Sequence, residues 1–180
     1  EVLDGFYITN EAQIEKIAKK IKFPAVMKAS GEGIIHKFQA GGIILNISDE
    51  KQLIDAFKKI RQVKNFNQAF VQTQRPGKEF LLGIKKTPEF GQVIGFGTGG
   101  VNTEKIKDVT FRIPPFDEDE AKKMILETKI SKNMTNQEKN FSVKNLMLLE
   151  ALSKKFPLIK ELDINPLTNG KIVDARIIFE

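Results

Sequence analysis

The chain of 180 residues lacks cysteine and tryptophan, and it has a single histidine, His36. The absence of cysteine excludes disulfide bonds, thiolate metal sites and cysteine nucleophiles. Long apolar runs are also missing, since none approaches the roughly 18 residues that span a membrane. Residues 1–20 lack the basic and then apolar layout of a signal peptide. We therefore expect a cytoplasmic protein with no membrane partner.

Arginine is scarce, with only four among the 29 basic residues, although the net charge is +6. A basic chain suggests a nucleic-acid partner, but direct base recognition favours the bidentate arginine side chain. The lysines instead occur in pairs on the surfaces of expected helices, where they are typical of solvated faces. These pairs are Lys19-Lys20, Lys58-Lys59, Lys122-Lys123 and Lys154-Lys155. We expect no nucleic-acid partner, and salt-sensitive binding to nucleic acid would contradict this expectation.

Hydrophobic residues make up 41% of the chain and charged residues 29%, which is an ordinary globular composition. Helical and strand patterns alternate without repeats, which predicts an α+β protein. We expect a βαβ-like first lobe over residues 1–68 and a mainly antiparallel second lobe over residues 69–180. Helices are expected after Asn10, from Asp49, and at about 117–128 and 142–155. Strands are expected at 25–27, 43–47, 69–73, 79–85, 92–96 and 109–113, with a hairpin over 161–179.

The segment from Ser30 to Gly41 joins two expected strands and contains His36. Long connections that carry glycine in compact domains are usually functional or mobile. One interpretation is a surface loop with a solvated histidine. The other is a nucleophilic imidazole on a movable arm, because neutral imidazole can accept a phosphoryl group and release it again.

A glycine-rich segment, Gly95-Phe96-Gly97-Thr98-Gly99-Gly100, follows an expected strand. Glycines allow backbone N–H groups to approach phosphate oxygens. The segment is neither a dinucleotide fingerprint nor a Walker loop, because it leads toward another strand and has no Gly-Lys-Ser/Thr. A phosphate-binding turn and a plain glycine-rich hairpin turn both remain open at this point.

Asn169-Gly170 predicts a two-residue hairpin turn, and such a turn fixes the pairing register of its strands. In that register Asn165 faces Asp174. Alternation places Asp163, Asn165, Asp174 and Arg176 on one face, and Leu162, Ile164, Val173, Ala175 and Ile177 on the buried face. The amide and carboxylate oxygens form half of a Mg²⁺ site, which phosphates and water complete. A plain polar pair beside an Asp163–Arg176 salt bridge is the alternative.

Several motifs occur in an order that resembles a known family. They are Phe-Pro-Ala-Val-Met-Lys (23–28), Ile-Ile-His-Lys (34–37), Gly-Gly-Ile-Ile-Leu-Asn (41–46), Val-Gln-Thr-Gln with Gly-Lys-Glu-Phe-Leu-Leu-Gly (71–83), the segment 88–100, Asp-Val-Thr-Phe-Arg-Ile-Pro-Pro (108–115) and Glu-Leu-Asp-Ile-Asn-Pro-Leu with Val-Asp-Ala-Arg-Ile (161–177). Together they resemble the ATP-grasp subunit of ADP-forming acyl-CoA synthetases. The succinyl-CoA synthetase β subunit shares the last motif.

The resemblance implies a fold of two α+β lobes with ATP or ADP between them. It implies the reaction of acyl-CoA, ADP and phosphate to acid, CoA and ATP, or the reverse. Nothing in the chain resembles the CoA-binding or acyl-phosphate-forming domains, so the resemblance also implies a companion alpha subunit or domain that carries those sites.

The resemblance also assigns roles to single residues. Lys28 contacts the nucleotide phosphates, Arg112 binds a phosphoryl group, and Asn165 with Asp174 holds Mg²⁺. The other implied nucleotide contacts are the hinge strand Gln72, Thr73 and Gln74 beside adenine, Glu79 beside the ribose, and Gly97, Gly99 and Gly100 near the phosphates. His36 is implied as the second phosphohistidine of a relay, which takes the phosphoryl group from the companion subunit and passes it to ADP.

The chain departs from the family at Phe38-Gln39, where the family usually has Ser-Asp after His-Lys. An acidic residue that orients the loop is therefore missing, which affects the expected loop geometry more than the role of His36. The family subunit also normally has a leading segment before residue 1, so a fragment is one expectation. A second possible function is a nucleotide-sensing ATP-grasp domain of a fused acyltransferase without turnover, against which His36 argues.

Overall fold

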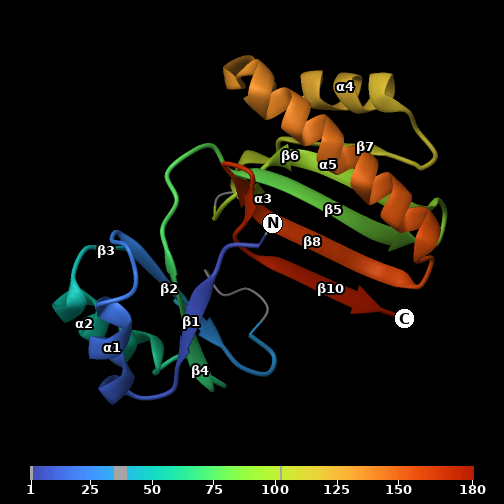
Figure 1. The fold of residues 1–180 in the computed structure, drawn as a ribbon. Coiled ribbons are helices and arrows are strands. Elements are labelled where there is room, and N and C mark those ends of the chain that lie inside the picture. The colour runs from blue at the N-terminus through green and yellow to red at the C-terminus, as the bar shows by residue number, and fades with distance from the viewer. Residues whose placement is uncertain (1, 35–39, 102) are drawn as a thin grey trace. The chain divides into compact units, whose positions relative to one another are not determined.

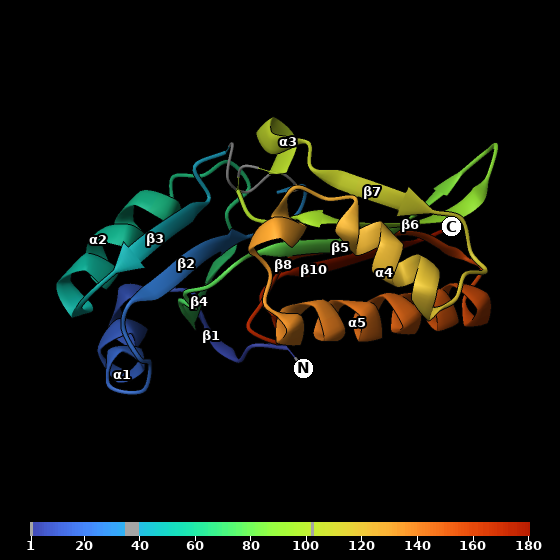
Figure 2. The same cartoon turned by 90° about the horizontal axis from the view of Figure 1, so that it is seen from above.

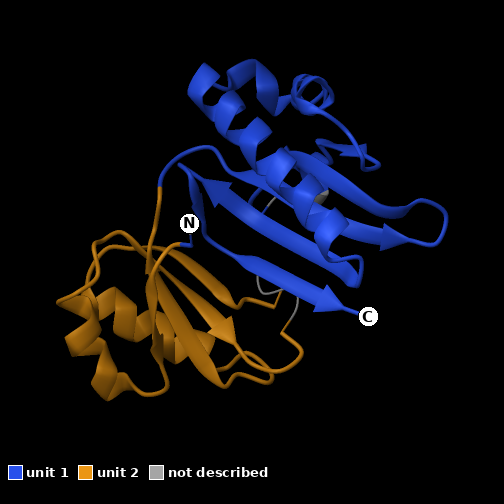
Figure 3. Ribbon diagram, turned by 45° about the vertical axis from the view of Figure 1, so that its right-hand side comes forward, with its two compact units in different colours: residues 1–2, 76–180 blue, residues 3–75 orange. Residues whose placement is uncertain are grey.

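The computed structural model describes residues 2–34, 40–101 and 103–180, and these form two compact units (Figure 3). Unit 2 covers Leu3–Arg75, and unit 1 covers residues 1–2 and 76–180. The chain therefore passes from one unit to the other after Arg75, later than the expected boundary between residues 68 and 69. The reason is strand β4 (Gln68–Thr73), which pairs with strands of the first sheet.

Unit 2 is a four-stranded antiparallel sheet with helices, in the strand order β1-β4-β2-β3 (Figure 1). Its elements are β1 (Gly5–Ile8), η1 (Glu11–Gln13), α1 (Ile14–Ala18), β2 (Ala25–Ser30), β3 (Ile43–Ile47) and α2 (Glu50–Ile60), followed by β4. Strands β1 and β2 run parallel with β4 between them, and β3 and β4 run parallel with β2 between them. The expected βαβ-like pattern is thus present, but the two parallel strands of each pair are separated by an antiparallel strand. Strand β1 was not expected from the sequence.

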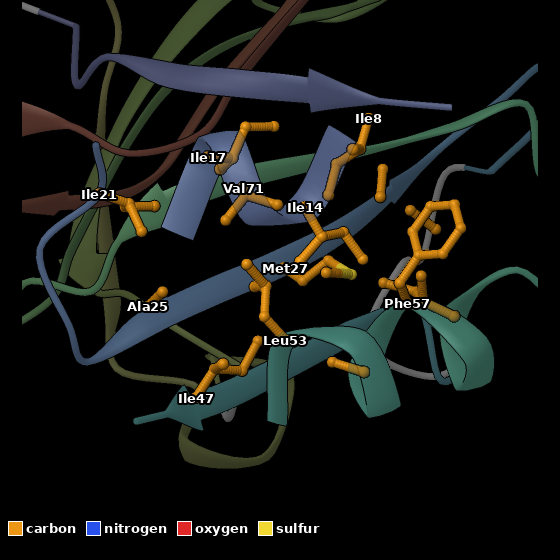
Figure 4. Packing of buried hydrophobic residues seen from close by; sticks show 14 residues of the cluster. Ile8, Ile14, Ile17, Ile21, Ala25, Met27, Ile47, Leu53, Phe57 and Val71 are labelled. Carbon is orange, nitrogen blue, oxygen red and sulfur yellow. The ribbon is translucent and has the colours of Figure 1, made fainter. Parts of the chain in front are cut away.

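The core of unit 2 lies between its sheet and its helices (Figure 4). Helix α2 begins where the Asp49 carboxylate accepts a hydrogen bond of 2.8 Å from Gln52 N–H, which satisfies a free donor of the first turn. Its side chains Leu53, Phe57 and Ile60 are buried, as the helical spacing predicts. Burial of this apolar stripe fixes one face of the sheet as the core face.

Unit 1 is built on an antiparallel sheet in the order β10-β8-β5-β6-β7, with β9 paired to β8. Its elements are β5 (Phe80–Thr87), β6 (Gly91–Thr98), α3 (Thr103–Ile106), β7 (Val109–Arg112), α4 (Glu118–Leu126), η2 (Ile130–Asn133), α5 (Asn136–Lys155), β8 (Ile159–Thr168), β9 (Lys171–Ile172) and β10 (Ala175–Phe179). The single turn α3 was not expected between the glycine-rich segment and β7.

Helices α4 and α5 lie together on one face of this sheet (Figures 1 and 2). Helix α5 begins at Asn136, earlier than the expected residue 142. Thr135 and Glu138 form a capping box there, with Thr135 N–H donating to the Glu138 carboxylate at 2.7 Å and Glu138 N–H donating to Thr135 Oγ1 at 3.2 Å. The sequence carried this signal, because a Thr followed three residues later by Glu is typical of a helix start.

The sheet of unit 1 has two chemically different faces. Partners in an antiparallel pair point to the same side, and neighbours along a strand point to opposite sides. Ile94 and Leu82 are buried in the core that includes residues of α4 and α5, so they mark the helix-covered face. Asp163 pairs with Gly83, next to Leu82, and therefore lies on the opposite face together with Asn165.

Strand β10 corrects one expectation about burial. Ala175 and Ile177 pair with Ile164 and Leu162, as the hairpin register predicts, but both are exposed and Ile177 retains 47% of its surface. Helices α4 and α5 pack on β5, β6 and β7, whereas β10 forms the edge of the sheet away from β7 and has no such helix cover among these contacts. Alternation thus predicted the correct face of the sheet for Ala175 and Ile177, but their position on an edge strand leaves them exposed.

All eight paired lysines are exposed, which confirms that they form solvated faces. Among the residues that the structure describes, no helix is both long and apolar enough to cross a membrane.

Candidate nucleotide and metal site

The terminal hairpin has the register that Asn169-Gly170 predicts. Thr168 pairs with Lys171, and Asn165 N–H donates to the Asp174 carbonyl oxygen at 3.1 Å. Asn165 and Asp174 therefore occupy opposite positions of one strand pair, and their hard oxygens suit Mg²⁺. Among the described residues, no cluster of three or more His, Asp or Glu could hold a metal by itself. A cation at this pair needs oxygens from another source, such as phosphates.

The side chain of Asn165 joins the hairpin to the glycine-rich segment. Its Oδ1 accepts a hydrogen bond of 2.6 Å from Gly100 N–H, and its Nδ2 lies 3.5 Å from Thr103 Oγ1. The Thr103 hydroxyl donates to the Gly100 carbonyl oxygen at 2.7 Å. Residues from β8 and from the β6–β7 connection thus meet around one amide group.

The three glycines with expected phosphate contacts are each required by close packing. A Cβ on Gly97 would lie 2.1 Å from the Asp108 carbonyl oxygen, and one on Gly99 would lie 2.5 Å from the backbone of Phe80. Gly100 has φ +88°, which L-residues rarely adopt, and a Cβ there would meet the Glu79 carboxylate. The Glu79 carbonyl oxygen also accepts from Gly99 N–H at 2.7 Å. Glu79 and the glycine-rich segment therefore share one site in unit 1.

Asp108 anchors the far end of this segment, a role that sequence analysis missed. Its buried carboxylate accepts hydrogen bonds from Lys129 N–H and the Thr98 hydroxyl at 2.7 Å each, and from Ile130 N–H at 3.0 Å. Burial works to raise the pKa of this carboxyl, but the three donors outweigh it and hold the pKa below its ordinary value. The motif 108–115 contained Asp108, yet its partners lie 10 to 22 residues away in the sequence, so no local pattern indicated them.

Arg112 lies apart from the hairpin pair, because it is on the other face of the same sheet. It pairs with Ile94 on the helix-covered face, and its guanidinium contacts Glu127 at 2.6 Å and Glu120 at 3.2 Å. Glu127 first, and then Glu120, raises the pKa of Arg112. The structure therefore does not bring Arg112 together with Asn165 and Asp174, and it shows the arginine joining β7 to α4.

Asp163 lies on the same face as Asn165 and is largely withdrawn from water. Burial raises its pKa, opposed by the charge of Arg176 and assisted by the charges of Glu161 and Asp174. Arg176 is the register partner of Asp163, but its guanidinium forms an ion pair with Glu161. The Asp163–Arg176 salt bridge expected from alternation is thus replaced by an Arg176–Glu161 pair.

In unit 2 the structure brings Lys28 and Gln72 onto the same face of the first sheet. Lys28 pairs with Phe70 and Val26 pairs with Gln72, and this face is opposite the core face that holds Met27 and Val71. Lys28 is only 6% exposed and Gln72 only 1% exposed. A lysine is rarely buried to this extent without an anionic or polar partner.

The Gln72 side chain has one satisfied and one unsatisfied end. Its Nε2 donates to the Leu3 carbonyl oxygen at 2.9 Å, whereas Oε1 is buried without a hydrogen-bond partner among the described residues. Because Nε2 is fixed by a carbonyl, Oε1 is held as an acceptor. A buried acceptor of this kind is suited to a ligand donor such as the amino group of adenine.

The remaining hinge residues are held by their own strand neighbours. Thr73 pairs with Ala25, and Gln74 N–H donates to the Pro24 carbonyl oxygen at 2.8 Å. The Gln74 side chain exchanges hydrogen bonds with Asn46, which has φ +58°. The backbone N–H of Gln74 is therefore engaged within unit 2. His36, the expected phosphohistidine, lies outside the described residues.

Comparison with protein families identifies the fold. Residues 1–178 match the ATP-grasp domain family, described as an ATP-grasp domain. The chain belongs to the ATP-grasp family. A solved structure of acetyl-coenzyme A synthetase 1 from Ca. Korarchaeum cryptofilum, in complex with coenzyme A and Ca-AMPCP, is similar with a TM-score of 0.82 and 30% identity, over 99% of this chain and 86% of that one. The α+β, ATP-grasp expectation is thus confirmed.

Two curated relatives show where such an ATP-grasp domain occurs. The beta subunit of acetate–CoA ligase (ADP-forming) I from Pyrococcus furiosus is 33% identical, over 94% of this chain and 81% of the subunit. The 4-hydroxybutyrate–CoA ligase (ADP-forming) of Nitrosopumilus maritimus is 38% identical over 93% of this chain, but the chain spans only 27% of that protein. The same domain is therefore found as a separate subunit and as one part of a longer ligase.

Proposed function

We propose that this chain is the nucleotide-binding subunit or domain of an ADP-forming acyl-CoA synthetase. The reaction converts acyl-CoA, ADP and phosphate to acid, CoA and ATP, or runs in reverse. The single observation that carries the proposal is the hairpin register, which places Asn165 opposite Asp174 beside the glycine-rich segment. The ligase names of relatives that match nearly the whole chain support it. The CoA-binding and acyl-phosphate sites belong to a companion alpha subunit or domain.

Each unit, taken by itself, has residues whose chemistry suits part of a Mg-nucleotide. In unit 1 the Asn165 and Asp174 oxygens would hold Mg²⁺, which shields phosphate charge when bound. In unit 2 Lys28 would contact phosphates, and the unpaired Oε1 of Gln72 would accept from the adenine amino group. Glu79 beside the ribose, and Gly97, Gly99 and Gly100 near the phosphates, complete the proposed nucleotide contacts. Thr73 and Gln74 would contact adenine through backbone groups. The N–H of Gln74 is not one of these groups, because it donates to the Pro24 carbonyl oxygen.

His36 would carry the phosphoryl group between the companion subunit and ADP. In the forward direction a nitrogen–phosphorus bond on His36 breaks and an oxygen–phosphorus bond to the terminal phosphate of ADP forms. The imidazole is left neutral and ready for the next phosphoryl group. This part of the proposal rests on the sequence motif 34–37 alone. Arg112 is left out of the proposed nucleotide contacts, because two carboxylates hold its guanidinium on the helix-covered face.

Titration calorimetry with ADP and MgCl2 tests the nucleotide site. We expect Asp174→Ala to weaken ADP affinity at least about tenfold, which corresponds to roughly 1.4 kcal/mol for one good ligand contact. Asp55→Ala, which removes an exposed carboxylate from α2, is the matched control and should bind like the wild type. Equal affinity of Asp174→Ala and the control in saturating Mg²⁺ would contradict the metal assignment.

Labelling with ATP distinguishes the relay from nucleotide sensing. The chain with Mg²⁺ and γ-labelled ATP, alone or in complex with its companion subunit, should acquire an acid-labile and base-stable label on His36. In the complex, His36→Asn should bind nucleotide normally but make no ATP, because the fold remains and the nucleophile is lost. ATP formation by His36→Asn at the wild-type rate would refute the relay and favour the sensing function.

A further inference from the structure

The amide group of Asn165 stands in a closed ring of hydrogen bonds with Gly100 and Thr103. Gly100 N–H donates to Asn165 Oδ1 at 2.6 Å, and the Thr103 hydroxyl donates to the Gly100 carbonyl oxygen at 2.7 Å. The third side joins Asn165 Nδ2 to Thr103 Oγ1 at 3.5 Å, which makes it the weakest of the three.

This ring permits only one orientation of the amide. Gly100 N–H must face an acceptor, which is the amide oxygen. The single hydroxyl proton of Thr103 is used by the Gly100 carbonyl, so Oγ1 offers only lone pairs and must face a donor, which is the amide nitrogen. A rotation of the amide by 180° would bring two donors together at Gly100 and two acceptors together at Thr103. The hydrogen bonds therefore hold the amide with Oδ1 at Gly100 N–H and Nδ2 at Thr103 Oγ1.

We propose that Thr103, acting through Gly100, is a positioning residue that orients the Asn165 amide oxygen toward a divalent cation. The oxygen accepts two interactions, and Gly100 N–H occupies one of them, which leaves one lone pair for a cation. Groups that orient a metal ligand commonly change metal affinity tenfold to a hundredfold when they are removed. This inference rests on the proposed Mg-nucleotide function and extends it to Thr103, to which no sequence motif assigns a role.

Removal of the Thr103 hydroxyl should change the affinity for Mg²⁺ but not the affinity for the nucleotide. Thr103 contacts the amide of Asn165 and the backbone of Gly100, both of which belong to unit 1. Loss of its hydroxyl should therefore weaken the response to Mg²⁺ and leave ADP binding without a metal unchanged. A merely structural threonine would lower stability without changing the Mg²⁺ response.

The test measures ADP affinity by calorimetry across a series of MgCl2 concentrations and in EDTA. For Thr103→Val we expect the Mg²⁺ concentration that gives half of the effect to rise about tenfold. ADP affinity in EDTA should stay within about twofold, and Thr103→Ser, which keeps the hydroxyl, should restore the wild-type response. If Thr103→Val does not fold, Thr103→Ala provides the same loss of hydroxyl with less crowding.

Thr110→Val is the matched control within the same unit. The Thr110 hydroxyl donates to the Met124 carbonyl oxygen at 2.9 Å, and Thr110 pairs with Phe96 on the helix-covered face. This variant should lose thermal stability and keep the wild-type Mg²⁺ response.

Two outcomes would overturn the inference, and they differ in their consequences. If ADP affinity of the wild type responds to Mg²⁺ and Thr103→Val responds equally, the positioning role is wrong while the metal site stands. If the wild type itself does not respond to Mg²⁺, both the metal site and the inference are wrong. In apo samples, the two side-chain amide proton signals of Asn165 should also shift in Thr103→Val and remain in place in Thr110→Val.

Discussion

The two faces of the unit 1 sheet have the same backbone but different chemical tasks. On the helix-covered face, Ile94 and Phe96 are fully buried and Arg112 is held by two carboxylates of the α4 region. On the opposite face, Asp163 and Asn165 present polar groups, and the pKa of Asp163 is raised by burial. Buried apolar side chains therefore line the first face, and a carboxyl and an amide group lie on the second. The face of the sheet on which a residue lies therefore indicates its role better than its residue type does.

The assignment matters most for Arg112. A motif alone suggests a phosphoryl ligand, because arginine binds phosphate well. The register places its side chain on the face opposite Asn165, where carboxylates neutralise its charge. By contrast, Asn165 and Asp174 were paired from the turn alone, and the structure keeps that pairing.

The largest effect is expected when the same substitution, Ile to Ala, is made at two positions of this sheet and the losses of stability are compared. Ile94→Ala removes a fully buried side chain from a central strand, whereas Ile177→Ala removes a side chain that is 47% exposed at the edge. We expect the first to lower the free energy of unfolding by about 2–5 kcal/mol and the second by less than about 1 kcal/mol. Denaturant unfolding measures both. Equal losses would contradict the contrast between the central and the edge strand.

The next effect concerns Asp108, which joins the glycine-rich segment to η2. Asp108→Asn should lower the free energy of unfolding by about 2–3 kcal/mol near neutral pH, because an amide cannot accept from all three donors. The folded pKa of the carboxyl lies below its unfolded value, so its contribution is present above that unfolded value. The contribution is lost as the pH falls through the folded pKa.

Denaturant unfolding of wild type and Asp108→Asn across the acid range measures this contribution. The difference between them should shrink steadily as the pH falls below 3.8, the ordinary value for an aspartate. A difference that stays constant to low pH would show that the lost charge is not the cause. Thr98→Val, which removes one of the three donors, should show a smaller loss.

The smallest expected effect is that of Arg112→Ala. Its ion pairs with Glu120 and Glu127 are partly exposed, so we expect a loss of about 1 kcal/mol in the free energy of unfolding. ADP affinity with Mg²⁺ should stay within about twofold, since the side chain lies on the helix-covered face. A tenfold loss of affinity at unchanged melting temperature would show instead that Arg112 leaves its carboxylates to bind a phosphoryl group.

Local signals carried much of the fold. Asp49 and Asp117 cap helices where the sequence suggests, because a capping carboxylate needs only residues within one turn. The hairpin register followed from Asn169-Gly170 for the same reason, since a two-residue turn fixes both strands. The start of α5 carries the same kind of local signal, the capping box of Thr135 and Glu138. Strand β1 offered only four residues, too few for periodicity to distinguish.

The sequence by itself thus determined the family, the α+β class and the pairing of Asn165 with Asp174, because these depend on motif order and on contacts close along the chain. Tertiary structure alone decided which face Arg112 occupies, how Thr103 and Gly100 meet Asn165, and why Ile177 is exposed. Each of these depends on strand order or on partners tens of residues away. Pairing between distant strands is set by the packing of the whole sheet, and no local pattern records it.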